Sequence, residues 1–225
     1  MTTRLIGLTG YKGAGKDTAA RLLIDIIPNA HRLAFADALR ERVCDAYRGA
    51  ITVEQLTDPA TKETPMHVLR LDNCAFPGFV FYAMKALGSN DVDAPRSPRH
   101  IMQLYGAWKR EEDPNHWVKE LHQRLTLATA AINARHLLDD DSATPITFII
   151  TDVRYKNEAT YVLGDGGHIA TVLMPQAAQA NDPHSSEQGE AFTFADFKIW
   201  NDGTIDDLRI ECSRLVRELA MEGKA

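Results

Sequence analysis

Glycines and lysines gather in one nine-residue stretch near the start of the chain. Residues 10–18 read Gly-Tyr-Lys-Gly-Ala-Gly-Lys-Asp-Thr, with the spacing of a Walker A loop, which cradles nucleotide phosphates. Glycines let backbone N–H groups converge on phosphate oxygens, and the helix that follows presents its positive N-terminus. An apolar, β-prone run precedes the stretch and a helical pattern follows it, as this loop requires. We therefore expect a phosphate site made of Gly10, Lys12, Gly13, Ala14, Gly15, Lys16, Asp17 and Thr18. The alternative is a turn with no phosphate role.

One position departs from that motif. Asp17 directly follows the lysine, where serine or threonine normally helps to hold Mg²⁺, and Thr18 comes one residue later. The sequence leaves open which of the two lies nearer a metal ion.

An acidic and a basic residue follow a buried, β-branched run at 146–151. Ligands of an open parallel sheet lie beyond the carboxyl ends of its strands. Asp152 is well placed there to act on Mg²⁺ or its water shell, and Arg154 to bind a phosphate bidentately. The alternative is that Asp152 caps the next helix and Arg154 forms a surface ion pair.

A third group of candidates lies on a predicted helix at 97–106. Ser97 is the expected N-cap and Pro98 the first helical residue, which puts Arg99 in the first turn and Gln103 one turn further. Basic residues and indoles then alternate as far as Trp117, a composition that suits guanidinium contacts to phosphate and aromatic contacts to a base. Trp117 fits a place in the hydrophobic core equally well.

Residues 175–196 have the composition of a lid and contain neither Lys nor Arg. Lids that close over a transferring phosphoryl group often supply arginines. Here the charge must be met by Lys12, Lys16, Arg99, Lys109, Arg110 or Arg154. Within the stretch, Ser185 and Gln188 could also form a simple capping box.

The elements that position these residues alternate between strand and helix, which predicts an α/β domain with a parallel sheet. The expected strands are 4–9, 32–36, 146–151, 168–174 and 197–200. The expected helices are 16–27, 37–47, 97–106, 115–138, 155–164 and 205–221. We expect a single domain over residues 1–225, with an insertion of short helices at about 52–93 and a lid at about 175–196.

The amino-acid composition limits which kinds of binding partner and which location are expected. With 25 basic and 31 acidic residues the net charge is -6, so no general attraction to nucleic acid is expected. The three cysteines are odd in number and far apart, which predicts reduced thiols without a zinc site. No signal peptide or membrane-spanning run is recognised, and we expect a cytoplasmic protein without a membrane partner.

Taken together, these segments resemble the deoxynucleoside monophosphate kinases of tailed bacteriophages. The likeness covers most of the chain in order. It rests on Gly15-Lys16-Asp17-Thr18, Arg99 with Met102-Gln103, Asn115 to Lys119, Asp152-Val153-Arg154 with Glu158, Asn181 to His184 with Glu187, and Asn201-Asp202-Gly203. The resemblance implies a P-loop fold like that of adenylate kinase, with three layers around a central parallel five-stranded sheet. It also implies transfer of the γ-phosphoryl of ATP to a deoxynucleotide with Mg²⁺ as cofactor.

Residue roles follow from that resemblance. Lys12 and Lys16 would hold ATP phosphates, and Asp17, which is usual after the lysine in this family, would act near Mg²⁺ with Asp152. Arg99 and Arg154 would hold the monophosphate. The expected catalytic residues are Lys16, Asp17, Arg154 and Arg110, and the expected substrate contacts are Arg99, Gln103, Trp117, Asp152, Arg154 and Glu187. Residues 52–93 match nothing in the family, so the base is expected to be read there.

Two other functions stay open. Animal phosphomevalonate kinases look similar in the loop, the Asp-x-Arg element and the His-x-Ser-Glu element, although their loop is more basic. A nucleotide-dependent switch or binding module is the alternative outside metabolism. A GTPase is disfavoured because no Asn-Lys-x-Asp motif follows a late strand. The expected partners are ATP and a deoxynucleoside monophosphate, in the host cytoplasm if a phage encodes the chain, and a homodimer is left open.

Overall fold

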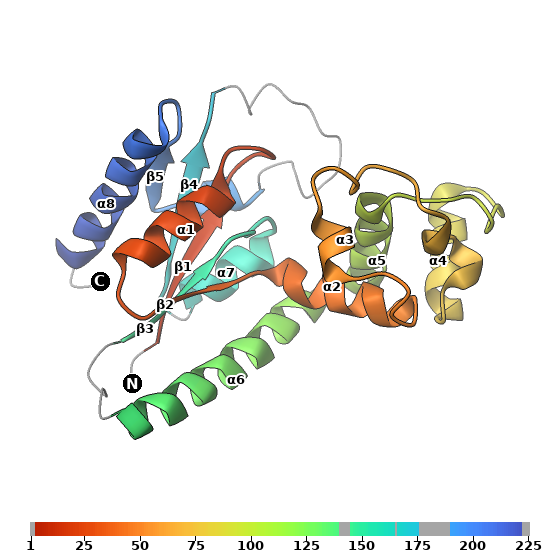
Figure 1. The fold of residues 1–225 in the computed structure, drawn as a ribbon, viewed down its shortest axis with the longest axis horizontal. Helices are drawn as coiled ribbons and strands as arrows, with labels where there is room; N and C mark the ends of the chain where they lie inside the picture. The colour runs from red at the N-terminus through yellow and green to blue at the C-terminus, as the bar shows by residue number, and fades with distance from the viewer. Residues whose placement is uncertain (1–2, 140–144, 165, 176–189, 222–225) are drawn as a thin grey trace. The chain divides into compact units, whose positions relative to one another are not determined.

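A computed structural model describes residues 3–139, 145–164, 166–175 and 190–221. Its elements are shown in Figure 1. In chain order they are β1 (Thr3–Thr9), α1 (Lys16–Ile26), β2 (Ala30–Leu33), α2 (Phe35–Ala46), α3 (Val53–Thr57), the 3₁₀ helices η1 (His67–Leu69) and η2 (Leu71–Asn73), α4 (Pro77–Leu87), α5 (Pro98–Glu112), α6 (His116–Asp139), β3 (Ile146–Ile150), α7 (Lys156–Gly164), β4 (His168–Leu173), η5 (Glu190–Phe194), β5 (Phe197–Trp200) and α8 (Ile205–Met221).

The strands form one five-stranded sheet in the order β2-β3-β1-β4-β5. Every neighbouring pair is parallel, and the central strand β1 pairs Gly7 with Ile150 of β3 and Thr9 with Thr171 of β4. The predicted α/β class with a parallel sheet is confirmed. Because the strands are parallel, their carboxyl ends meet at one edge, and the segments that follow β1, β3 and β5 lie along it.

Helices cover both faces of this sheet, which gives three layers (Figure 1). On one face, alternate strand residues such as Ile6, Leu8 and Val172 pack with Leu23 of α1 and Leu215 of α8 in one buried cluster. Each such side chain contributes about 1.5–3 kcal/mol when fully buried. On the other face, α7 packs against β1 and β4.

The chain packs as two compact units. The first comprises Met1–Phe35 and Leu121–Ala225 and holds the whole sheet. The second, Ala36–Glu120, is helical. Its core includes Tyr47, Phe79 and Tyr105, all almost fully buried. The short helices expected within residues 52–93 are present as α3, η1, η2 and α4.

Two predicted elements differ most from the observed ones. The second strand is Ala30–Leu33 rather than 32–36, because Phe35 already begins α2. The helix expected to end at Gly106 continues to Glu112. Gly106 is buried inside α5, where a Cβ would lie 3.5 Å from a methyl carbon of Leu39, so this glycine marks close packing and not a helix end.

The longest described helix, α6, has 24 residues. Its His, Lys, Glu and Arg side chains are spread over most of its length. Within the described part of the chain, no helix combines the length and the apolar character needed to cross a membrane.

Candidate active site

The nine-residue glycine-rich stretch forms the connection between β1 and α1. Three of its glycines have positive φ angles: 147° at Gly10, 78° at Gly13 and 92° at Gly15. Residues that carry a Cβ rarely adopt these φ angles, so the loop needs glycine at these positions to turn back on itself. A Cβ on Gly10 would also come within 2.6 Å of the Val172 carbonyl oxygen. The predicted strand–loop–helix context is confirmed.

The N-terminus of α1 opens directly onto this loop. Gly15 is the N-cap residue and has no side chain with which to satisfy the first helical N–H groups. Uncapped N–H groups at a helix start, together with the helix dipole, bind anions well. Asp17 and Thr18 lie in the first turn, Asp17 exposed and Thr18 accepting a 3.4 Å hydrogen bond from Arg21.

The side chain of Lys16 reaches back over the loop. Its Nζ donates to the carbonyl oxygens of Gly10 at 2.7 Å and Tyr11 at 2.8 Å. These two bonds hold the ammonium against the same backbone that the glycines shape. Lys12 is exposed in the middle of the loop.

A residue from the far end of the chain also holds the loop. Asn201, directly after β5, donates from Nδ2 to the Ala14 carbonyl oxygen at 2.9 Å. The same nitrogen occupies the space that a Cβ on Gly15 would need. Nothing in the spacing of residues 187 positions apart indicates this contact.

The loop has a third support in η5. The ring of Tyr11 meets the ring of Phe192 edge-on, with 4.8 Å between centroids. Such pairs add about 0.5–1.5 kcal/mol beyond their buried area. The loop is thus held by α1, by Asn201 and by Phe192.

Asp152 lies beyond the carboxyl end of β3, next to β1, the strand that precedes the glycine-rich loop. Its Oδ1 accepts a 2.7 Å hydrogen bond from the backbone N–H of Phe35, the first residue of α2. Val153 N donates to the Leu8 carbonyl oxygen at 3.1 Å and ties this segment to β1. Asp152 therefore does cap a helix, but it is α2 and not the next helix in the chain.

Arg154 follows two residues later and is half-buried. The carboxylate of Glu158 accepts hydrogen bonds from the backbone N–H groups of Arg154 at 2.9 Å and Tyr155 at 3.1 Å. Glu158 is only 2% exposed. A buried carboxylate with two backbone donors fixes the start of α7 and hence the position from which the Arg154 side chain extends.

The oxygen ligands available at this edge suit Mg²⁺. Within the described residues, no group of three or more His, Cys, Asp or Glu side chains could hold a metal ion. Magnesium in nucleotide sites takes most of its ligands from water and phosphates, with one or two protein carboxylates. Asp17, Thr18 and Asp152 supply hard oxygen atoms of that kind, so they fit a metal that is brought by the nucleotide.

The other predicted substrate residues belong to the second unit, on or next to α5. Ser97 accepts a hydrogen bond from His100 N at 3.3 Å, so the predicted N-cap is confirmed. The Arg99 side chain donates from Nε to the carboxylate of Glu63 at 2.7 Å. The backbone N–H of Arg99 donates to the Lys62 carbonyl oxygen at 3.0 Å. Gln103 is half-buried one turn further, and Arg110 lies in the last turn.

Trp117 lies in the core of the second unit. The residue is 2% exposed, and its Nε1 donates to the Gly106 carbonyl oxygen at 3.2 Å. The core role that the sequence left open accounts for both observations. The neighbouring indole of Trp108 packs on Phe79 and Tyr105 and carries Lys109 Nζ at 3.9 Å from its centroid.

Histidines of the second unit are shifted toward the neutral form. Burial, together with Arg96, lowers the pKa of His100 below its ordinary value. Burial also lowers the pKa of His116.

The predicted contact Glu187 and most of the expected lid, residues 176–189, lie outside the described residues.

The first unit thus brings together the loop, Asp152, Arg154 and Asn201 at one edge of the sheet, in an arrangement that can hold a phosphate chain with a metal ion. A putative deoxynucleotide monophosphate kinase of Acanthamoeba polyphaga mimivirus is 26% identical over 205 residues, which cover 90% of this chain and 91% of that protein.

Two solved structures show a weak overall likeness. A dephospho-CoA kinase from Campylobacter jejuni has a TM-score of 0.41 at 15% identity, covering 99% of this chain and 100% of that one. The protein TT1252 from Thermus thermophilus has a TM-score of 0.39 at 18% identity, covering 97% and 99%. At this level of overlap neither says anything about the substrate.

The model of the deoxynucleotide monophosphate kinase family matches residues 89–211. That match takes in Arg99, Asp152, Arg154 and Asn201 and more than half of the chain. The chain therefore belongs to the deoxynucleotide monophosphate kinase family.

Proposed function

We propose that this protein transfers the γ-phosphoryl group of ATP to a deoxynucleoside 5′-monophosphate, giving ADP and the diphosphate. The observation that carries the proposal is the loop between β1 and α1, with three glycines at positive φ and Lys16 folded over it. The family supports a nucleotide as acceptor.

On the donor side, the loop backbone and the start of α1 would bind the phosphate chain of ATP. Lys16 would exchange the carbonyl oxygens of Gly10 and Tyr11 for phosphate oxygens, which carry full charge and form stronger hydrogen bonds. Lys12, exposed on the same loop, would add a second positive charge.

Magnesium bound with ATP would neutralise charge on the phosphate chain as the phosphoryl group moves. Asp17 and Thr18 on α1 and Asp152 after β3 would hold the ion or its water shell. The Phe35 N–H fixes one oxygen of Asp152, so the orientation of that carboxylate is set before a nucleotide binds.

On the acceptor side, the attacking atom is already a phosphate oxygen, and no strong general base is needed. Catalysis then consists of positioning and charge neutralisation. We assign Arg154 to the acceptor phosphate, as the family resemblance implies. Glu158 fixes the backbone from which the Arg154 side chain extends. Arg99 and Gln103 stay predictions for the same substrate, and Arg110 stays a prediction for the transferring group.

A coupled assay of ADP release tests the proposal. The acceptors are the deoxynucleoside monophosphates, the ribonucleoside monophosphates and phosphomevalonate, each with ATP and Mg²⁺. We expect fast turnover with at least one deoxynucleoside monophosphate. Lys16→Ala should lower the rate about 100-fold or more while the protein stays folded, because removal of one donor to a transition-state charge has effects of that size.

Lys198→Ala, at an exposed position of β5, removes the same charge away from the loop and serves as the control. Near-normal turnover by Lys16→Ala would contradict the phosphate role of the loop. A preference for phosphomevalonate would show that the acceptor is not a nucleotide. ADP release at the same rate with and without each acceptor would indicate a nucleotide-dependent switch.

A further inference from the structure

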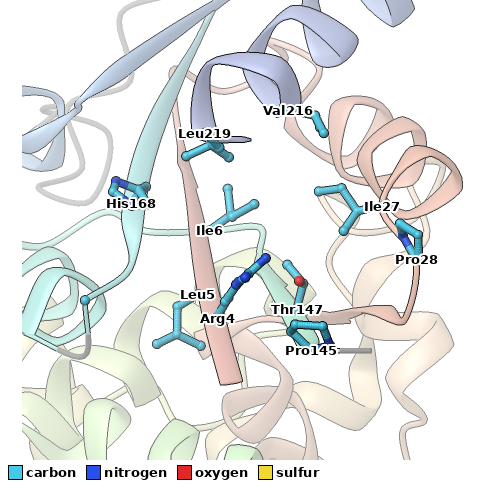
Figure 2. Close-up of a pocket in the computed structure, with 11 residues that line it drawn as sticks. Arg4, Leu5, Ile6, Ile27, Pro28, Pro145, Thr147, His168, Val216 and Leu219 are labelled. Carbon is cyan, nitrogen blue, oxygen red and sulfur yellow. The ribbon is translucent and has the colours of Figure 1, made fainter. Parts of the chain in front are cut away.

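A cavity of about 240 Å³ lies in the first unit at the edge of the sheet opposite the glycine-rich loop. It is lined by residues near the starts of three strands, Arg4 of β1, Thr147 of β3 and His168 of β4, and by the ends of α1 and α8 (Figure 2). Gly10 follows Arg4 by six residues of extended chain, so the loop lies roughly 20 Å away. The cavity is therefore separate from the candidate active site.

Most of the lining is apolar. Ile6, Ile27, Val216 and Leu219 form much of the wall. The polar groups are Arg4, Thr147 and His168, and none of the lining residues is acidic. A wall of this kind with one positive charge suits a ligand that has an apolar body and a single anionic group.

Arg4 supplies that charge. Figure 2 shows its side chain extending into the space between Ile6 and Thr147. Within the described residues, no hydrogen bond or ion pair joins the Arg4 side chain to another residue. A guanidinium binds a carboxylate through two parallel N–H···O bonds, and the low polarity of the neighbouring wall strengthens them.

His168 provides a second sign that this end of the sheet accepts a polar group. The residue is 8% exposed, and its Nδ1 lies 3.5 Å from Asp196. Its Nε2 is enclosed and has no hydrogen-bond partner in the described part of the chain. A buried side-chain nitrogen usually has a hydrogen-bond partner, so Nε2 can bind a polar group.

We propose that this cavity binds a small amphipathic carboxylate, with the carboxylate on Arg4 and the apolar body against Ile6, Ile27 and Leu219. The volume equals that of roughly eight water molecules in the liquid. A short alkyl or aryl acid fits a space of this size. The site stands whether or not the proposed reaction is correct.

Hexanoate is the probe, titrated into the full chain and followed by NMR chemical shifts. 1-Hexanol has the same apolar body without the charge, and hexylamine reverses the charge. We expect shifts at the lining residues and an affinity for hexanoate about tenfold or more above that for hexanol. ATP should not displace hexanoate, because the loop lies at the other edge.

Two variants test the placement. Arg4→Gln should lower the affinity for hexanoate about tenfold and leave that for hexanol unchanged, since only the charge-assisted bonds are lost. Arg209→Gln, on the exposed face of α8, changes the net charge equally and should have no effect. If Arg4→Gln does not fold, Val216→Phe fills the cavity from α8 and should abolish binding of both compounds.

Equal affinities for hexanoate and hexanol would overturn the proposal, as would hexanoate binding that Arg4→Gln and Val216→Phe leave intact. Displacement by ATP would place the carboxylate on the loop and would also overturn it. No shifts at the lining residues up to saturating hexanoate would show that the cavity takes no such ligand.

Discussion

Asn201 Nδ2 donates a 2.9 Å hydrogen bond to the Ala14 carbonyl oxygen, so the residue after the last strand holds the loop after the first. Asn201 is itself fixed by the bond from its backbone N–H to the Leu173 carbonyl oxygen at 2.8 Å. The shape of the loop, and with it the direction of its N–H groups, depends on a contact that only the folded sheet creates.

Removing this amide should weaken ATP binding more than it slows the chemical step. Asn201→Ala loses one hydrogen bond to the loop, and the Ala14 carbonyl is left without this partner. Such a loss is worth about 0.5–1.5 kcal/mol, or about a 2- to 12-fold rise in KM for ATP. Steady-state kinetics with ATP varied at saturating acceptor measures it. Asn201→Asp should be worse, because a carboxylate repels the carbonyl oxygen.

Asp202→Ala, at the exposed neighbouring position, is the matched control and should behave as the native protein. If Asn201→Ala changed kcat alone, or changed nothing, Asn201 would not position the loop.

Two glycines of the loop make a second comparison. Gly13 and Gly15 both have positive φ, but a Cβ meets nothing within 4 Å at Gly13, whereas at Gly15 it meets Asn201 Nδ2. Both alanine variants carry backbone strain, of order 1–3 kcal/mol. Only Gly15→Ala adds a steric conflict, so it should lower the melting temperature and raise KM for ATP more than Gly13→Ala does.

The double variant Gly15→Ala/Asn201→Ala isolates that conflict. It should recover part of the loss caused by Gly15→Ala, since the side chain in the way is gone. Strictly additive effects in the double-mutant cycle would contradict the contact.

Arg154→Ala should chiefly raise KM for the monophosphate, by about tenfold or more, because a bidentate bond to phosphate is lost. Arg154→Lys keeps the charge but not the fork and should recover the KM only in part. Kinetics with each substrate varied in turn measures both effects, with Arg209→Ala as a surface control. A KM change confined to ATP would place Arg154 on the donor side.

Stability should fall as the pH is lowered from about 7 to about 5. Burial, the first cause in each case, lowers the pKa of His31, His100 and His116, so the folded chain disfavours their charged forms. Below the ordinary histidine pKa the unfolded chain binds protons that the folded chain does not, and this favours unfolding. The contribution is complete above that pKa and is lost as the pH falls through the lowered values.

Melting temperatures across this range measure the effect. His100→Gln should flatten the dependence, because one of the three groups no longer titrates. A melting temperature that rises on acidification would contradict the direction assigned to these histidines.

Local signals predicted most of the fold. The β-branched run at 146–151 and the Ser97-Pro98 cap predict a strand and a helix start from neighbouring residues alone, and both elements are present as β3 and α5. The predicted bounds of β2 were wrong for a long-range reason. Asp152 accepts a hydrogen bond from the Phe35 N–H, and α2 begins there.

In the candidate site, too, the sequence predicted the local features and missed the long-range contacts. The glycine and lysine spacing predicts the loop because that motif encodes its own backbone geometry. Asn201 and Phe192 could not be assigned to the loop, because their contacts depend on strand order. Trp117 fitted two environments in the sequence, and only its burial and its bond to Gly106 favour the core.

The most direct test of the central claim follows the γ-phosphoryl group itself. ATP labelled at the γ-position is incubated with the protein, Mg²⁺ and each deoxynucleoside monophosphate, and the products are separated. We predict that the label appears in the deoxynucleoside diphosphate in the same amount as ADP forms, and that Lys16→Ala abolishes it. Label released only as inorganic phosphate, at a rate independent of the acceptor, would contradict the account.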